Sequence, residues 1–265
     1  MVFGFSGDRI TSMDLQLNDR VFIVTAASAG LGRATADALV AEGAKEVLVA
    51  RRAEVLDEAV AGFGTDSAVA LAADLGDSET PQRACRAALD TFGRLDGALI
   101  SVGGPPAGPV TSITDEQWRD GFESVFLAAV RTISAVIEHG TAADLAIACV
   151  LSTSALSPIP GLTVSNGLRP GLAMLIKQVA DEHGANGVRV NGLMPGRIAT
   201  ERVNYLDSLA DDPQAAKVES ASRIPLRRYG EPEEFGRVAT FLLSPAASYV
   251  SGSLIAVDGG ALRAL

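Results

Sequence analysis

The sequence is poor in the residues that build disulfide frameworks and metal sites. Its 265 residues include two cysteines, Cys85 and Cys149, and two histidines, His139 and His183. Cys149 lies in the apolar run "LAIACVL" (145–151), which predicts a buried thiol and gives no sign of a disulfide framework. Both histidines fall at expected helix ends, where capping is commoner than catalysis. Because no group of His, Cys and Asp has metal-ligand spacing, we expect no metal site.

Long hydrophobic runs and an excess of basic charge are also missing. The longest apolar stretches, such as residues 145–151, are far too short to span a bilayer. The N-terminal "MVFGFSGDRITSMDL" has no long apolar segment of the kind found in secretory signals, so the sequence predicts a cytoplasmic protein. The net charge of -10 would repel nucleic acid and anionic lipid, so neither is expected as a partner.

The chain is instead a regular alternation of short apolar runs and helical patterns. The expected strands are Val21–Thr25, Glu46–Ala50, Ala68–Ala72, Gly97–Val102, Ala146–Leu151, Val188–Leu193 and Leu254–Val257. The expected helices lie near residues 31–42, 53–62, 79–92, 115–138, 168–184 and 231–243. Such alternation predicts right-handed βαβ units and a mainly parallel sheet covered by helices on both faces.

The alternation indicates a single domain over residues 13–265. Met13, followed by "DLQLNDRVFIVT", is a second plausible start, so residues 1–12 are interpreted as an N-terminal extension. Residues 197–230, with "DDPQ" and scattered charge, interrupt the pattern. A long interruption of this kind is typical of a substrate lid.

The segment "VFIVTAASAGLGRATADALVAEGA" (21–44) has the order strand, tight glycine loop, amphipathic helix. Gly30 and Gly32 would let the backbone approach a pyrophosphate, and the helix that follows would offer free N–H groups and the positive end of its dipole. Two glycines can also simply connect a strand to a helix. The residues at the end of the next strand therefore help to decide between a pyrophosphate-binding loop and a simple connection.

The end of that second strand favours a phosphorylated ribose. In "EVLVARRAEVL", Ala50 stands where a carboxylate would bind a ribose 2′-hydroxyl, and Arg51 and Arg52 follow it. A guanidinium fork without a competing carboxylate fits a 2′-phosphate better than a bare hydroxyl. The alternative is an ordinary solvated arginine pair at a helix start. The sequence thus predicts that NADP(H) is preferred over NAD(H).

Together with further motifs, these features resemble the short-chain dehydrogenase/reductase family from about Leu17 to Gly260. The marks are "TAASAGLG" (25–32), "ADL" (73–75), "GG" (103–104), "VRVNGLMPGRIAT" (188–200) and "RIPLRRYGEPEEFGRVATFLLSPAASYVSGSLIAVDGG" (223–260). The segments "GGPPAGP" and "SPIPGLTVSNGLRPG" are similar to a divergent subgroup that resembles 3-oxoacyl-carrier-protein reductases. The resemblance implies a doubly wound, Rossmann-type α/β fold with a mostly parallel seven-stranded sheet. It also implies a homotetramer, or at least a homodimer, built through the two long central helices.

The resemblance further implies where a nicotinamide cofactor would bind. Asp74 would contact the adenine, and Thr200 with Ile198 would contact the nicotinamide carboxamide. The full set of cofactor-binding residues expected on this basis is Thr25, Ser28, Gly30, Leu31, Gly32, Arg51, Arg52, Asp74, Leu75, Gly103, Arg169, Pro195, Gly196, Ile198 and Thr200.

Most of the family's catalytic positions have changed in this chain. Ser152, at the end of "IACVLS", aligns with the family's serine. Thirteen residues later Ser165 replaces the tyrosine, and four residues beyond it Arg169 replaces the lysine. The asparagine position holds Val125, and the first glycine of the phosphate loop is Ala26. The catalytic set expected here is therefore Ser152, Ser165 and Arg169.

These changes affect proton delivery more than binding. An aliphatic hydroxyl such as Ser165 is a much weaker acid than a tyrosine phenol, and loss of a positioned acid costs about 10²–10⁴ in rate. Arg169 keeps a positive charge and donors for ribose hydroxyls, but it does not relay protons. Ser152 can still hydrogen-bond a carbonyl oxygen. Tyr205, on the expected lid, is the only tyrosine that is a candidate for contact with a substrate, and the alternative is that it simply packs within the lid.

Pro170 directly follows Arg169 and lacks a backbone N–H. A proline also disfavours helical geometry at the residue before it, so the helix would start near residue 168 or kink there. Alternatively, Pro170 lies in a tolerated first turn.

The sequence leaves three functions open. The first is an NADP(H)-dependent oxidoreductase that acts on a small-molecule carbonyl or alcohol with non-standard proton delivery. The second is a non-catalytic nucleotide-binding sensor or partner subunit, suggested by the changed catalytic positions beside an intact phosphate loop. The third is a lyase or dehalogenase, suggested because some relatives of that kind carry Arg in place of the lysine. It ranks last because those relatives keep the tyrosine and lose the nucleotide loop, the reverse of what this chain shows.

Overall fold

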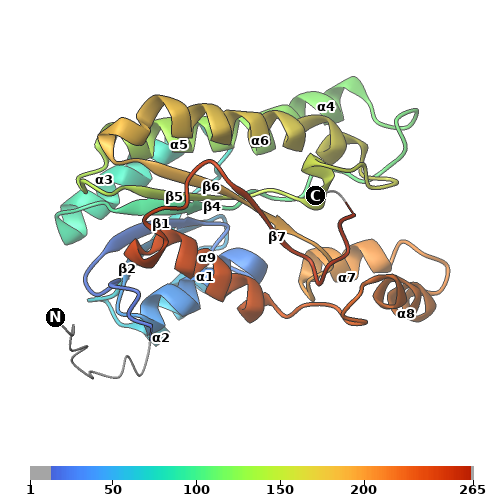
Figure 1. Ribbon diagram of the computed structural model, residues 1–265, viewed down its shortest axis with the longest axis horizontal. Helices are drawn as coiled ribbons and strands as arrows, with labels where there is room; N and C mark the ends of the chain where they lie inside the picture. The colour runs from blue at the N-terminus through green and yellow to red at the C-terminus, as the bar shows by residue number, and fades with distance from the viewer. Residues whose placement is uncertain (1–12, 264–265) are drawn as a thin grey trace, which may run out of the picture.

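Seven apolar runs pair into one sheet in the computed structural model, which describes residues 13–263 (Figure 1). The strands are β1 (Val21–Thr25), β2 (Lys45–Ala50), β3 (Ala68–Ala72), β4 (Gly97–Ile100), β5 (Ala146–Val150), β6 (Arg189–Pro195) and β7 (Leu254–Val257). Their order is β3-β2-β1-β4-β5-β6-β7, and every pairing is parallel. The predicted doubly wound, Rossmann-type α/β fold is confirmed. The expected extension, residues 1–12, lies outside the described residues.

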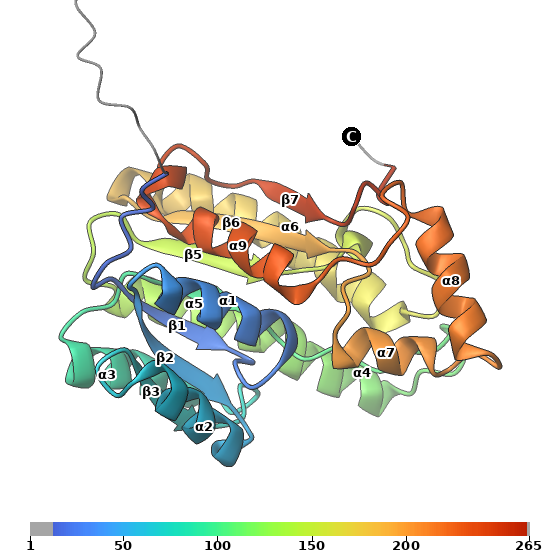
Figure 2. The ribbon, with the colours of Figure 1, turned by 90° about the horizontal axis from the view of Figure 1, so that it is seen from below.

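Helices cover both faces of the sheet, as Figures 1 and 2 show. The α-helices are α1 (Gly30–Ala41), α2 (Ala53–Phe63), α3 (Thr80–Phe92), α4 (Asp115–Gly121), α5 (Ala128–His139), α6 (Thr163–His183), α7 (Glu201–Asp207), α8 (Pro213–Arg223) and α9 (Pro232–Leu243). Alternate strand residues face opposite ways, so Val47 and Val49 of β2 join the core under α3, α5 and α6. Leu48 and Ala50 join the core under α1, α2 and α9. No helix within residues 13–263 is both long enough and apolar enough to cross a membrane.

The helix expected over residues 115–138 is interrupted by a wider turn. It begins with a capping box in which the Thr114 hydroxyl accepts the Gln117 N–H and the Gln117 side chain accepts the Thr114 N–H. A π-helical segment, Phe122–Leu127, then separates α4 from α5. Val125 lies in this segment and is buried in the core. Segments of this type are frequent near functional sites.

Helix α6 begins earlier than the sequence predicts. A start near residue 168, with Pro170 either delaying the helix or lying in its first turn, is wrong: α6 begins at Thr163, and Pro170 lies in its interior. The early start is held by Asn166, whose side-chain oxygen accepts the Ile159 N–H and whose amide donates to the Ile159 carbonyl. Ser165 and Arg169 therefore lie four residues apart on one buried side of the helix.

The strand order reverses direction between β1 and β4, which is where ligands bind in open parallel sheets. The segment 197–230, called the lid segment below after the role expected from the sequence, lies beyond the carboxyl ends of the strands and contains α7 and α8 (Figure 2). Its two ends are joined by a bridge between Ile198 and Gly230. Buried Asp207 ties the segment together, because it pairs with Arg197 and accepts the Tyr229 hydroxyl.

Candidate functional site

The loop after β1 is a tight turn that leads directly into α1. Ala26 has φ +52° and Gly30 has φ +58°, so both adopt the left-handed conformation. A Cβ added to Gly32 would lie 2.5 Å from the Ala26 carbonyl oxygen, so only glycine fits there. The N-terminus of α1 has no side-chain cap and no acidic residue in its first turn. Its free N–H groups and positive dipole end are therefore available to an anion.

Residues from five parts of the chain line one cavity of about 560 Å³ at the carboxyl ends of the strands. It is bounded by the loop at 29–32, the segment after β4, the segment from β5 to α6, residues 195–209, and Ala261 after β7. The predicted residues that it brings together are Gly30, Leu31, Gly32, Gly103, Ser152, Ser165, Arg169, Pro195, Gly196, Ile198 and Thr200. The predicted residues outside its lining are Thr25, Ser28, Arg51, Arg52, Asp74 and Leu75.

The residues outside the lining have identifiable contacts of their own. The buried Thr25 hydroxyl donates to the Ser101 carbonyl at 2.6 Å and accepts the Ser101 N–H at 2.8 Å, so it joins the ends of β1 and β4. Arg52 donates to the hydroxyl and carbonyl oxygens of Ser28, which brings the end of β2 against the loop before α1. The Asp74 carboxylate accepts the Gly76 N–H and shapes the turn after β3.

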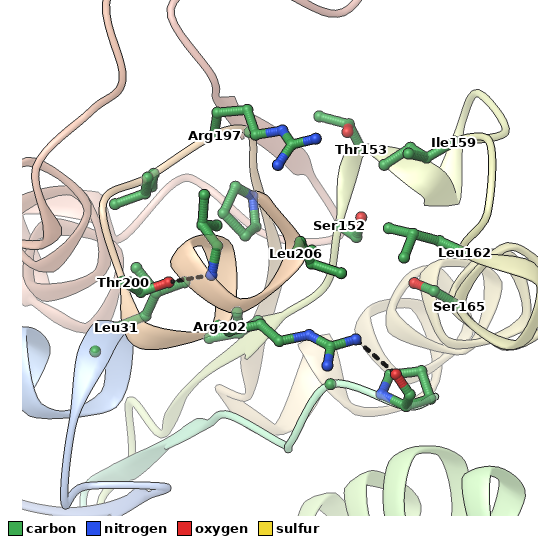
Figure 3. Close-up of a pocket in the computed structure, with 18 of the residues that line it drawn as sticks. Leu31, Ser152, Thr153, Ile159, Leu162, Ser165, Arg197, Thr200, Arg202 and Leu206 are labelled. Carbon is green, nitrogen blue, oxygen red and sulfur yellow. Dashed lines mark hydrogen bonds between the residues drawn. The ribbon is translucent and has the colours of Figure 1, made fainter. Parts of the chain in front are cut away.

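Three serine hydroxyls gather where β5 meets α6. The Ser152 hydroxyl accepts the Ser154 N–H at 3.1 Å and caps a short 3₁₀ turn, Thr153–Ala155. The hydroxyls of Ser154 and Ser165 are 3.0 Å apart, and both side chains are buried. Ser152 and Ser165 line the cavity, as Figure 3 shows. The sequence reasoning missed Ser154, although the run "STS" places a hydroxyl two residues beyond Ser152.

Arg169 reaches from α6 to the end of β5. One of its terminal nitrogens donates to the Val150 carbonyl, while its buried Nε has no partner among the described residues. The guanidinium lies beside the Cys149 thiol, and burial lowers the pKa of Arg169 to about 10. Burial likewise raises the pKa of Cys149 to about 12. At neutral pH the arginine is therefore charged and the thiol is protonated.

The lid segment contributes two arginines that the sequence reasoning did not single out. Arg197 and Arg202 both line the cavity. Arg202 donates to the Pro105 carbonyl at 2.6 Å, and its guanidinium carbon lies 5.4 Å from the ring centre of Tyr205. The Tyr205 side chain is half exposed and is absent from the cavity lining. Arg202 could have been identified from the sequence by its position, two residues after Thr200 at the start of the expected lid.

Comparisons with known proteins decide the family. A family model described as enoyl-(acyl carrier protein) reductase matches residues 25–261. Levodione reductase from Leifsonia aquatica is 33% identical over 264 residues, which cover 94% of this chain and 97% of that protein. The chain belongs to the short-chain dehydrogenase/reductase family. It is an oxidoreductase of that family, as the names of its relatives, dehydrogenases and reductases, support.

Solved structures of the family match almost the whole chain. L-sorbose reductase from Gluconobacter frateurii, solved with NADPH and L-sorbose, has a TM-score of 0.89 at 28% identity and covers 96% of this chain and 100% of that one. A short-chain oxidoreductase from Pseudomonas aeruginosa PAO1, described as containing an atypical catalytic center, has a TM-score of 0.86 at 28% identity. The match covers 94% of this chain and 99% of that one. Members of this family use nicotinamide cofactors and act on small molecules.

Proposed function

We propose that this chain is an NADP(H)-dependent carbonyl reductase or alcohol dehydrogenase that delivers the proton without a tyrosine. The observation that carries the proposal is the single cavity that joins the uncapped start of α1 to Ser152 and Ser165. One end of this cavity suits the phosphates of a dinucleotide, and the other presents hydroxyls to a reacting carbonyl. Binding and reaction sites are therefore continuous.

The residues present fit a nicotinamide cofactor. The turn at Gly30 and Gly32 leaves no side chain above the first N–H groups of α1, where a pyrophosphate would be held. Thr200 approaches Gly30 from the opposite wall, since its Cγ2 would lie 3.5 Å from an added Cβ. Ile198 and Thr200 would hold the nicotinamide carboxamide, and Asp74 the adenine. When bound, the nicotinamide supplies or accepts the hydride.

The preference for NADP(H) rests on the two arginines after β2. Arg52 is anchored to Ser28, whereas exposed Arg51 has no ion pair among residues 13–263. Arg51 is thus free to contact a 2′-phosphate beside the loop, and Ala50 places no competing carboxylate there. The structural relative from Gluconobacter frateurii was solved with NADPH, which supports the same choice.

The chain's own groups would orient the carbonyl but supply the proton weakly. Ser152 would donate a hydrogen bond to the carbonyl oxygen. Ser165, paired with Ser154, would at most relay a proton from water, because neither hydroxyl has a pKa near neutrality. Arg169 would hold the ribose or polarise the oxygen while remaining protonated. Val125 is buried and has no polar group to support a proton-relaying water. The relative from Pseudomonas aeruginosa, described as having an atypical catalytic center, indicates that altered sites occur among proteins of this fold.

The test is a titration of the protein with NADPH and NADH, followed by a carbonyl-substrate screen with the better cofactor. We expect tighter binding of NADPH, and Arg51→Ala should weaken NADPH far more than NADH. Arg83→Ala, which removes an exposed arginine on α3, is the matched control and should change the affinity for neither cofactor. Equal losses for the two cofactors would refute the assignment of Arg51. Failure to bind either cofactor would favour the non-catalytic alternative.

We further propose that the protein assembles as a homotetramer, or at least a homodimer, in the cytoplasm. Exposed apolar side chains on the outer helices support the assembly: Met174 on α6 and Phe122, which stacks on Phe126 at 5.1 Å. Figures 1 and 2 show α5 and α6 on the same face of the sheet. The cytoplasmic location is supported by the two cysteines, which are buried free thiols.

A further inference from the structure

Arg202 connects two walls of the cavity. It comes from the first turn of α7 and donates to the Pro105 carbonyl in the segment after β4. Figure 3 shows its guanidinium directed away from Leu31 and toward the side of the cavity that holds Ser165. The segment after β4 is itself fixed to that side, because Gly108 pairs with Leu162 and its N–H donates to the Gly161 carbonyl.

The charge of Arg202 is not neutralised within the described residues. Three other arginines of the lid segment pair with carboxylates: Arg197 with Asp207, Arg223 with Glu219 and Arg228 with Glu234. The fourth, Arg227, lies outside the cavity lining and donates to the Ser222 carbonyl. Arg202 has a carbonyl and an aromatic ring as neighbours instead. Its sequence neighbour Glu201 is exposed and forms no ion pair with it. Burial lowers the pKa of Arg202, so its charged form is partly desolvated without an opposite charge.

A half-buried cation of this kind suits a ligand that brings the missing charge. The guanidinium fork has five N–H groups, and one terminal nitrogen is used by Pro105. The remaining donors can bind a carboxylate through two parallel hydrogen bonds. The rest of this end of the cavity is largely apolar and includes Ile159, Leu162 and Leu206 (Figure 3). The opposite wall offers the Ser152 hydroxyl.

We propose that the substrate is an oxo acid or hydroxy acid whose carboxylate is bound by Arg202 while Ser152 contacts the reacting oxygen. The inference rests on the proposed function and names the substrate class of the same site. The apolar residues between the two polar contacts would hold a hydrocarbon segment. Arg202 is therefore a specificity-determining residue, and it binds the end of the substrate that lies away from the reacting carbon.

Binding of unreactive probes tests the inference without relying on turnover. Linear carboxylates from butanoate to decanoate and the corresponding primary amides are titrated calorimetrically against the protein, with and without saturating NADPH. We expect at least one carboxylate to bind on the order of 10-fold tighter than its amide, which corresponds to a single charge-assisted contact. Arg202→Gln should abolish this preference, and Arg202→Lys should retain part of it. Arg223→Gln, an equal change of charge on exposed α8, is the control and should leave the preference intact.

The outcomes separate this inference from the proposed function. Equal affinity of carboxylates and amides for the wild type, or no binding of any carboxylate, in both the presence and absence of NADPH, would overturn the assignment of substrate class. A loss of NADPH affinity in Arg202→Gln with an unchanged carboxylate preference would also overturn it, and would assign the arginine to the cofactor's phosphates. Failure of NADPH to bind counts against the proposed function alone, because the carboxylate preference can still be measured on the protein without cofactor.

Discussion

Ala26 is the residue whose backbone departs most from its ordinary preference at the site. It has φ +52° in the phosphate loop, a conformation that costs a residue with a Cβ about 1 kcal/mol or more. Its neighbour Ala27 is fully buried, and the Ala27 N–H donates to the Val49 carbonyl. The chain therefore keeps a strained turn to bring the start of α1 into place.

Ala26→Gly should raise the free energy of unfolding by about 1 kcal/mol, since glycine adopts positive φ without the Cβ penalty. Urea denaturation followed by circular dichroism measures the change. Ala27→Gly is the matched control and should lower stability by a similar amount, because it adds backbone freedom and leaves a small cavity. If both variants lose stability, the turn is not strained at Ala26.

Pro170 has its effect at the level of a whole helix. It lies inside α6, where it cannot donate a hydrogen bond to the carbonyl four residues earlier, that of Asn166. The ring itself is exposed, so it contributes little packing. The contacts of Asn166 with Ile159 and the buried face of α6 offset the cost.

Pro170→Ala should raise the free energy of unfolding by about 1–3 kcal/mol, because alanine restores the missing hydrogen bond and the best helix propensity. The same denaturation experiment measures it. Gln178→Ala, on the exposed side of the same helix, should change stability by no more than about 0.5 kcal/mol. A loss of stability in Pro170→Ala would show that the proline's ring or its fixed φ is needed where it stands.

The elements that the sequence predicts well are those with an apolar face. Strands such as β1 and β5 are buried along their whole length, so they can be recognised in the sequence as continuous apolar runs. Helix α8 has no buried residue and α7 buries only Asp207, so neither has an apolar stripe that a sequence could reveal. The π-helical segment was also missed, because its hydrogen-bond pattern leaves no mark on the spacing of apolar residues.

The site could be predicted only in part, for a related reason. Residues in a recognisable loop, such as Gly30 and Gly32, follow from local spacing. The Ser154–Ser165 contact and the reach of Arg202 to Pro105 join segments that are far apart in the chain. Their proximity depends on where α6 starts and how the lid segment folds, and the sequence gives neither.

At the scale of the molecule, the exposed apolar side chains on α6 and the adjoining π-helical segment predict association. Light scattering at micromolar concentration should give the mass of a homotetramer, or at least of a dimer. Met174→Lys places a charge on a side chain that is 71% exposed, and should shift the population toward smaller species. Val218→Lys, on exposed α8, is the control and should leave the mass unchanged. A monomeric wild type would contradict the proposed assembly.

The central claim is that the chain binds a nicotinamide cofactor but lacks a matched proton donor. The most direct measurement is kcat/KM for one ketone at saturating NADPH, in the wild type and in Ser165→Tyr combined with Arg169→Lys. Because α6 begins before Ser165, both new side chains would start from helical positions. We expect the double variant to be faster by about 10²-fold, with a slow but measurable wild type. A wild type as fast as the double variant would contradict the claim, and would mean that another acid already supplies the proton.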